Sequence, residues 1–91
     1  MDLTDQQIRR EDIRAAVLNA LYARRSGAHR LDTIATLFLR DTETRPYEVE
    51  TTLTDLERMH LVQSAFEHSH SSIKVWQITG EGITFKERGF K

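Results

Sequence analysis

The sequence predicts a small α+β domain in which three helices precede a two-stranded β-hairpin and a short closing helix. Three observations predict this fold. Apolar residues recur at helical spacing in three segments before His60. After Leu61 the pattern changes to alternation, which is typical of half-buried strands. Short polar turns separate the segments, and the 91 residues contain no repeat or linker, so we expect one domain over residues 1–91.

The first helix is expected at about residues 5–25. Thr4 is placed to cap its start. A stripe of apolar residues then recurs on one face, and it includes Ile13, Val17 and Leu21. Such a stripe predicts that this helix covers the apolar faces of the two helices that follow.

The second helix is expected to be only two to three turns long, beginning near Leu31. Its apolar residues share one face at helical spacing; they are Leu31, Ile34, Leu37 and Phe38. A polar turn at residues 40–44 follows this segment and separates it from the next helix.

The third helix is expected at about residues 45–59. Pro46 suits its first turn, where the missing N–H of proline would have no partner in any case. Apolar residues then recur at spacings of four and three, at Val49, Leu53, Leu56 and Met59. The helix is expected to end before His60.

The hairpin is expected from strands at about residues 62–68 and 73–79, joined by a polar turn at residues 69–72. Four apolar side chains are predicted to cover the open end of the helical core, namely Val62, Phe66, Trp76 and Ile78. Ile73 and Val75 are predicted on the outer face. Residues 83–88 are expected to form the short closing helix.

Helices and hairpin in this order predict a helix-turn-helix with a β-wing, and particular residues carry a resemblance to a known class. Residues 49–62 and 76–82 resemble winged-helix regulators of the MarR, ArsR and PadR type and, more loosely, small winged-helix proteins of Mu-like phages. The matching positions are Val49, Leu53, Leu56, Glu57, Leu61, Val62, Ile78, Thr79 and Gly82. His60 replaces a glycine of that pattern, so we expect His60 in the left-handed conformation that this glycine takes.

The resemblance implies a transcriptional regulator whose third helix enters the major groove of duplex DNA while the wing contacts the backbone or minor groove. Carried onto this chain, it places the base-contacting candidates at the start of the third helix. They are Arg45, Tyr47, Glu48, Thr51 and Thr52, with Asp55 further along. Lys74 in the wing, together with Arg30 and Arg40 beside the turns, are the candidates for phosphate contacts.

The charge of the third helix opposes this interpretation. Residues 44–60 contain two arginines against four acidic residues, a net charge of -2, whereas DNA affinity depends largely on neutralised phosphates. We expect Glu57 and Glu50 to point to the side of the helix, and a carboxylate can accept a hydrogen bond from cytosine N4. The alternative is a winged helix used for protein contacts without DNA, in which Ile73 and Val75 form an apolar patch.

A chain of this length buries a thin core, so we expect a homodimer, with Ile8, Phe85 and Phe90 as candidate interface residues. The absence of cysteine excludes disulfides and thiolate zinc sites and favours a reducing cytoplasm. The sequence shows no secretory signal and no apolar run long enough to span a membrane.

No enzyme is expected, because the serines of the wing lack the strand-to-helix turn that exposes a nucleophile. His68 and His70 alone do not make a metal site. We therefore expect no catalytic residue, no metal and no cofactor.

Overall fold

The computed structural model of the chain describes residues 5–42 and 44–88 and confirms the α+β winged-helix fold. Thr4 and Phe90, to which the sequence assigns a helix cap and an interface contact, lie outside these residues. The helices are α1 (Asp5–Ala23), α2 (Leu31–Thr33), a π-helical turn η1 (Ile34–Phe38), a 3-10 turn η2 (Arg40–Thr42), α3 (Pro46–Arg58) and α4 (Gly80–Glu87). The strands are β1 (His29–Arg30), β2 (Val62–Phe66) and β3 (Lys74–Ile78).

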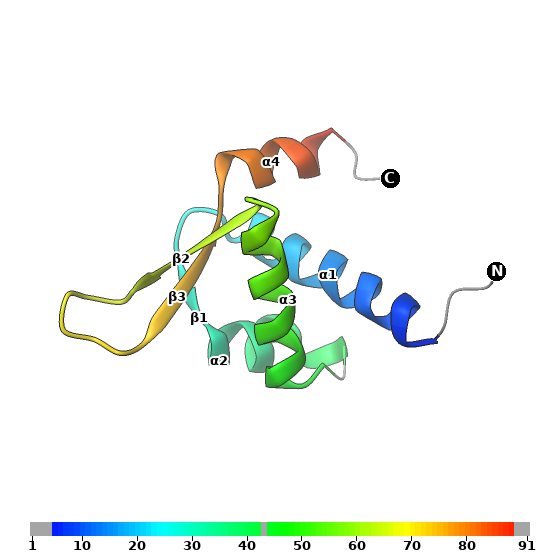
Figure 1. Cartoon of the computed structure of the whole chain (residues 1–91), viewed down its shortest axis with the longest axis horizontal. Coiled ribbons are helices and arrows are strands. Elements are labelled where there is room, and N and C mark those ends of the chain that lie inside the picture. Colours follow the sequence, from blue (N-terminus) through cyan, green and yellow to red (C-terminus); the bar gives the residue numbers. More distant parts are fainter. Residues whose placement is uncertain (1–4, 43, 89–91) are drawn as a thin grey trace.

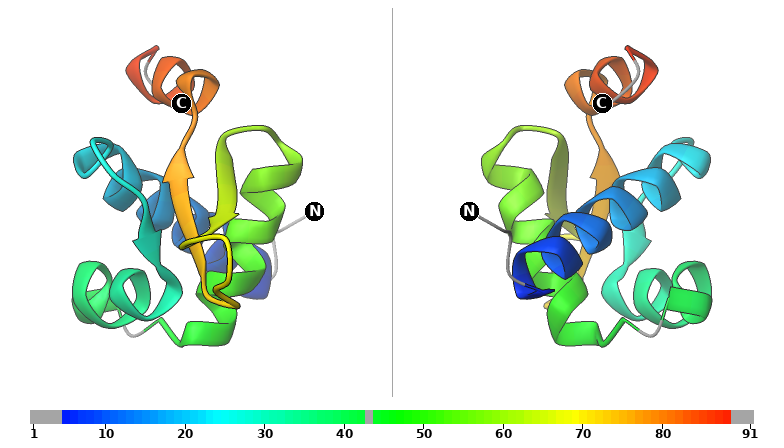
Figure 2. Two further views of the ribbon diagram at one scale, coloured as in Figure 1. Left: turned by 90° about the vertical axis from the view of Figure 1, so that its left-hand side faces the viewer. Right: turned by 90° about the vertical axis from the view of Figure 1, so that its right-hand side faces the viewer.

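The core lies where α1 crosses α3 and the base of the sheet. Figure 1 shows α3 in front of α1, and the right-hand view of Figure 2 shows α1 across α3 and the strands. The largest fully buried side chains come from all of these elements: Leu18, Leu21, Ile34, Leu53, Leu56, Val17, Val49 and Val62. The three apolar stripes therefore meet in one core, as the sequence predicts.

The sheet has three strands, in the order β1-β3-β2, and not the two that the sequence predicts. Strand β1 contains only two residues, paired with β3 as His29 with Trp76 and Arg30 with Val75. A two-residue strand has no alternating pattern of its own, so it could not be recognised from the sequence. Strands β2 and β3 form the expected antiparallel hairpin, but they are shorter at the turn than the predicted ranges.

The predicted burial of Phe66 is wrong, because its side chain is 59% exposed. Phe66 is the last residue of β2, where the hairpin has already left the helices and projects as the wing (Figure 1). Trp76 and Ile78, near the base of the hairpin, are buried as expected, and Ile73 is exposed on the wing. Met59 also differs from expectation: α3 ends one residue earlier, and the Met59 side chain is 44% exposed.

A π-helical turn changes which leucine of the second helix is buried. The backbone N–H of Leu39 donates to the carbonyl oxygen of Ile34, five residues earlier, at 3.0 Å. A π-helical turn contains more residues than an α-helical turn, so each residue rotates the chain by less, and one full turn after Ile34 ends nearer Leu39 than Leu37. As a result Leu37, predicted to face the core, is 57% exposed, and Leu39 is buried in its place.

The end of α3 confirms the left-handed conformation expected at His60, whose φ is 64°. The N–H of Leu61 donates to the Leu56 carbonyl oxygen and the N–H of His60 donates to the Glu57 carbonyl oxygen. These two bonds form a Schellman motif, which satisfies the last carbonyl groups of the helix and turns the chain into β2.

Thr79 and Gly82 join the base of the wing to the end of α3. The Thr79 hydroxyl donates to the His60 carbonyl oxygen at 2.7 Å and accepts a hydrogen bond from the Gly82 N–H at 2.9 Å. Thr79 thus caps α4, which begins at Gly80 and not, as predicted, at residue 83. Gly82 lies directly against the Leu61 carbonyl group, so its lack of a side chain is required there.

Candidate nucleic-acid interface

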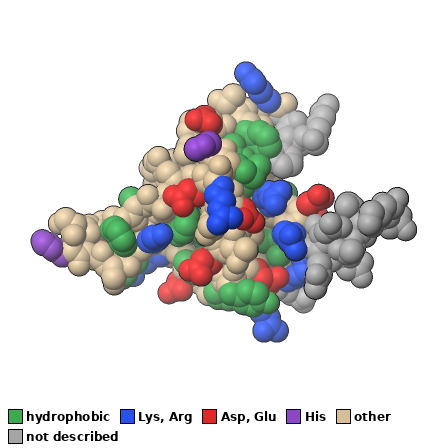
Figure 3. All heavy atoms as spheres, in the orientation of Figure 1, with side chains coloured by type: hydrophobic (Ala, Val, Ile, Leu, Met, Phe, Trp, Pro, Cys, Tyr) green, Lys and Arg blue, Asp and Glu red, His purple; other side chains and the backbone are tan. Residues whose placement is uncertain are grey.

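The outer side of α3, opposite the core, carries a stripe of four side chains at helical spacing, which we call the outer stripe: Tyr47, Thr51, Thr54 and Arg58. Tyr47 is 66% exposed, Thr51 and Arg58 are exposed, and Thr54 is half-buried. No described segment of the chain covers this face, which is turned toward the viewer in Figures 1 and 3. Figure 3 shows a hydrophobic surface at the lower end of α3, with acidic and basic side chains interspersed around it.

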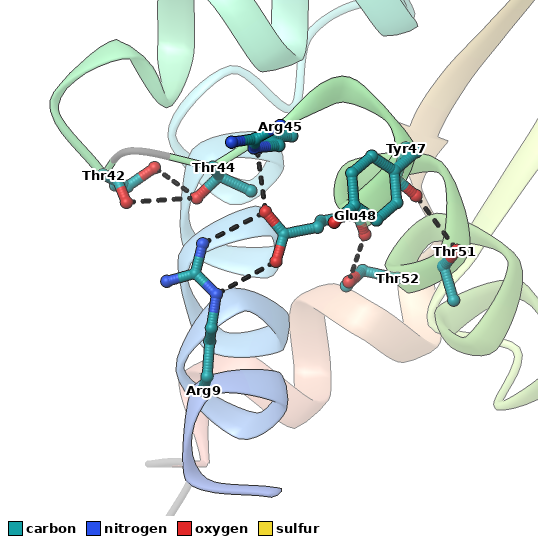
Figure 4. A network of polar contacts seen from close by, with 8 residues as sticks. All are labelled: Arg9, Thr42, Thr44, Arg45, Tyr47, Glu48, Thr51 and Thr52. Atoms are coloured by element: carbon teal, nitrogen blue, oxygen red, sulfur yellow. Dashed lines mark hydrogen bonds and ion pairs between the residues drawn. The ribbon is translucent and has the colours of Figure 1, made fainter. Parts of the chain in front are cut away.

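Glu48 is held at the side of α3 by partners from two elements. Its carboxylate accepts two hydrogen bonds from the Arg9 guanidinium of α1, both at 3.0 Å, and a third from the backbone N–H of Arg45, also at 3.0 Å. Figure 4 shows the carboxylate between these two residues, with Tyr47 on another side of the helix. The Arg9 hydrogen bonds, followed by that of the Arg45 N–H, lower the pKa of Glu48. Glu48 therefore caps the start of α3.

Of the other acidic side chains of α3, Glu57 has its partner away from the outer stripe, whereas Asp55 pairs with Arg58 of the outer stripe itself. Glu57 accepts hydrogen bonds from the backbone N–H and the hydroxyl of Ser64 in β2, at 3.2 and 2.7 Å. Asp55 forms an ion pair with Arg58 at 3.8 Å. Glu50 is exposed and, with Lys74 and Trp76, lines the groove between α3 and the wing. Two of the four carboxylates, Glu48 and Glu57, are thus held at the flanks of the helix, and Asp55 is paired with a cation, which weakens the electrostatic objection to DNA binding.

Thr52, a base-contacting candidate of the sequence, lies in the core. Its side chain is 5% exposed, and its hydroxyl donates to the Glu48 carbonyl oxygen at 2.8 Å. A helical residue between Val49 and Leu56 on the inner side cannot reach a ligand outside the protein. We therefore leave Thr52 out of the interface.

The cationic candidates come from three different segments of the chain. Arg45 precedes the first turn of α3, Arg40 is in η2, and Lys74 opens β3 in the wing; all three are exposed. Arg30 is engaged within the protein: its guanidinium donates two hydrogen bonds to the Glu67 carboxylate, at 2.5 and 2.6 Å. This contact lowers the pKa of Glu67 and ties β1 to the wing.

Sequence reasoning missed Thr54 and Arg58 as members of the outer stripe. The signal was present, because both follow Tyr47 at spacings of seven and eleven residues, which return to the same side of a helix. Within residues 5–42 and 44–88, no group of three metal-ligating side chains comes together. In the same part of the chain, no helix is long and apolar enough to cross a membrane.

Replacing Glu48 with glutamine should lower stability by about 1 kcal/mol at pH 7, because the charged hydrogen bonds to Arg9 are lost. Folding lowers the pKa of the Glu48 carboxyl, so its ionised form stabilises the folded state at pH values above the pKa that it has in the unfolded chain. This stabilisation is lost as the pH falls through the lower pKa of the folded state. The difference between wild type and Glu48→Gln in urea unfolding should therefore shrink as the pH drops below about 4. Glu50→Gln, the same change at an exposed site of α3, is the control. An equal effect of both substitutions would contradict the capping role.

No protein-family model and no curated protein sequence matches the chain. Several solved structures resemble the chain. Staphylococcus aureus MepR in its DNA-binding conformation matches with a TM-score of 0.70 and 22% identity, over 97% of this chain and 56% of that one. A MepR mutant from a multidrug-resistant S. aureus clinical isolate has the same TM-score and identity, over 85% and 53%. A mutant of Lactococcus lactis ZitR matches with a TM-score of 0.62 and 14% identity, over 81% and 48%.

These neighbours are MarR-family winged-helix regulators, and the likeness shows that this chain has their fold. The chain spans about half the length of the solved structures that it matches. The neighbours are transcription regulators and not enzymes.

Proposed function

We propose that this chain is a winged-helix transcriptional regulator that binds duplex DNA through the outer stripe of α3 and through the wing. The observation that carries the proposal is the uncovered outer stripe, beside which Glu48 and Glu57 are held by partners of the same chain. An α-helix presented in this way fits the width of the major groove. The fold shared with MepR, which has been solved in a DNA-binding conformation, supports the proposal.

In this proposal the contacts divide between bases and phosphates. Tyr47 and Thr51, on the first turns of α3, contact base edges, because the start of the recognition helix enters deepest into the groove. Arg45, Arg40 and Lys74 contact phosphates from the end of the helix, the preceding turn and the wing.

Two further candidates act by positioning in this proposal. Glu48 fixes the start of α3 against α1, and Arg30 fixes the wing through Glu67. The carboxylates of Glu48 and Glu67 are hydrogen bonded within the chain. Glu48 and Arg30 can therefore affect DNA binding without contacting the DNA.

Arg45→Ala and Lys74→Ala should each weaken binding to duplex DNA and reduce the slope of log K against log salt by about 0.9, the value for one phosphate contact. Fluorescence anisotropy with a labelled duplex over about 50–200 mM salt measures both quantities. Arg88→Ala is the matched control, since it removes an exposed cation at the end of α4, away from the wing. Equal slopes for all three variants and wild type would contradict the assigned phosphate contacts.

A protein partner is the second candidate function, and the exposed apolar side chains of the wing favour it. Phe66 is 59% exposed and Ile73 is 41% exposed, and both line a groove beside α2 and α3. Absence of duplex binding by the wild type at low salt would favour this function over DNA binding.

The homodimer also remains a proposal. Ile8 in α1 is 45% exposed and Phe85 in α4 is 36% exposed, so both have apolar surface to bury. Sedimentation at high micromolar concentration tests it, and a monomer there would contradict it.

A further inference from the structure

The two threonines of the outer stripe have their hydroxyl hydrogens engaged within the helix. The Thr51 hydroxyl donates to the Tyr47 carbonyl oxygen at 3.0 Å, and the Thr54 hydroxyl donates to the Glu50 carbonyl oxygen at 3.0 Å. Figure 4 shows the Thr51 bond, which turns the oxygen back along α3. A hydroxyl has one hydrogen to donate. Neither hydroxyl can therefore donate to a base, and each side chain offers a partner its methyl group together with a hydroxyl oxygen that can only accept.

Tyr47 extends this carbon-rich surface by one turn. It precedes Thr51 by four residues, so the two side chains are neighbours on the same face of α3. Its ring is the most exposed large apolar group among the described residues, at 66%. The first turns of the outer stripe thus present an aromatic ring and methyl groups, while the charged side chains Glu50 and Lys74 line the groove beside Thr51.

The side chains that usually read base edges by paired hydrogen bonds are absent from the centre of this stripe. Arginine, lysine, asparagine and glutamine make such pairs with guanine or adenine. In the major groove thymine differs from the other bases by its 5-methyl group, which is read by apolar contact. An aromatic ring beside a threonine methyl group is complementary to that group.

We infer that the outer stripe recognises thymine, through contact of Tyr47 and the Thr51 methyl group with thymine 5-methyl groups in the major groove. The inference rests on the proposed binding of duplex DNA. It identifies the preferred target as a duplex with thymine at the positions that face the first two turns of α3.

The first experiment selects duplexes bound by the wild-type chain from a random pool, and then replaces each thymine of the selected duplex with deoxyuridine. This replacement removes the 5-methyl group and leaves base pairing intact. One or two replacements should weaken binding about fourfold each, the effect expected for about 0.8 kcal/mol per buried methyl-sized group. Replacements elsewhere in the duplex should have no effect.

A matched pair of variants then tests which part of Thr51 is used. Thr51→Ser removes the methyl group and keeps the hydroxyl, whereas Thr51→Val keeps the methyl group and removes the hydroxyl. Thr51→Val should bind the selected duplex as tightly as wild type does, and its affinity should still fall when thymine is replaced with deoxyuridine. Thr51→Ser should bind the selected duplex more weakly. At one position of the duplex, its affinity should be the same with thymine as with deoxyuridine. Urea unfolding of both variants controls for stability, and Thr51 is exposed, so little change is expected.

Each other outcome has one meaning. Binding that no deoxyuridine replacement weakens would overturn the inference about thymine and leave the proposed DNA binding intact. Tight binding by Thr51→Ser together with loss of binding by Thr51→Val would assign recognition to the hydroxyl and would also overturn it. No binding of any duplex by the wild type at low salt would instead overturn the proposed function itself.

Discussion

Gly82→Ala is expected to destabilise the fold by about 3 kcal/mol or more, at the upper end of what overfilling a well-packed site costs. An added Cβ would lie 2.1 Å from the Leu61 carbonyl oxygen and 2.6 Å from Cγ1 of Ile78. The oxygen belongs to the backbone and accepts the Thr79 N–H, so it cannot move without disturbing the junction of α3, the wing and α4.

Gly80→Ala is the matched control for this experiment. Gly80 lies two residues earlier in the same helix, and an added Cβ there meets no atom within 4 Å. It should be neutral or stabilising by up to about 1 kcal/mol, because alanine restricts the unfolded chain. Thermal unfolding separates the two variants, since 1 kcal/mol shifts the Tm of a domain of this size by about 4–8 °C. Similar Tm values for both variants would contradict the close contact at Gly82.

Leu39→Ala is expected to cost about 2–5 kcal/mol, as for other buried leucines, whereas Leu37→Ala should cost less than about 0.5 kcal/mol. Leu39 is 3% exposed and Leu37 is 57% exposed, although they are two residues apart. The π-helical turn accounts for the difference, because regular helical spacing from Ile34 assigns the buried position to Leu37. Urea unfolding of the two variants tests the turn. A larger cost at Leu37 than at Leu39 would show that the segment is an ordinary α-helix.

The sequence predicted the parts of the fold that depend on repeated spacing. The stripes of α1 and α3 and the alternation around Trp76 locate the core, since each repeats a single spacing over several turns or residues. The positive φ of His60 could also be predicted, from the glycine that it replaces in a recurrent pattern. Features that depend on tertiary contacts could not be predicted from the sequence. The π-helical turn and the two-residue strand β1 form where other elements meet them, and neither has a local signal.

The candidate interface was predictable to the same extent. The spacing identifies the outward residues Tyr47 and Thr51, but Thr52 looks equally suitable until the core position of α3 is known. In the sequence, Glu48 and Glu57 look like charges that would repel DNA. Their partners cannot be recognised there, because Arg9 lies in α1, far from Glu48 in the sequence, and Ser64 lies in β2. Charge totals over a helix therefore say little about the charge of one of its faces.

A single charged substitution on the outer stripe tests the central claim, that this face of α3 binds duplex DNA. Thr51→Glu adds a carboxylate at the centre of the stripe, and Thr84→Glu adds the same charge to an exposed threonine of α4 as its control. In anisotropy titrations at low salt, we expect the wild type and Thr84→Glu to bind duplex with similar affinity. Thr51→Glu should bind at least tenfold more weakly, because it brings an unpaired carboxylate into a partly dehydrated groove that is flanked by phosphates. Equal affinity of the two variants would contradict the claim.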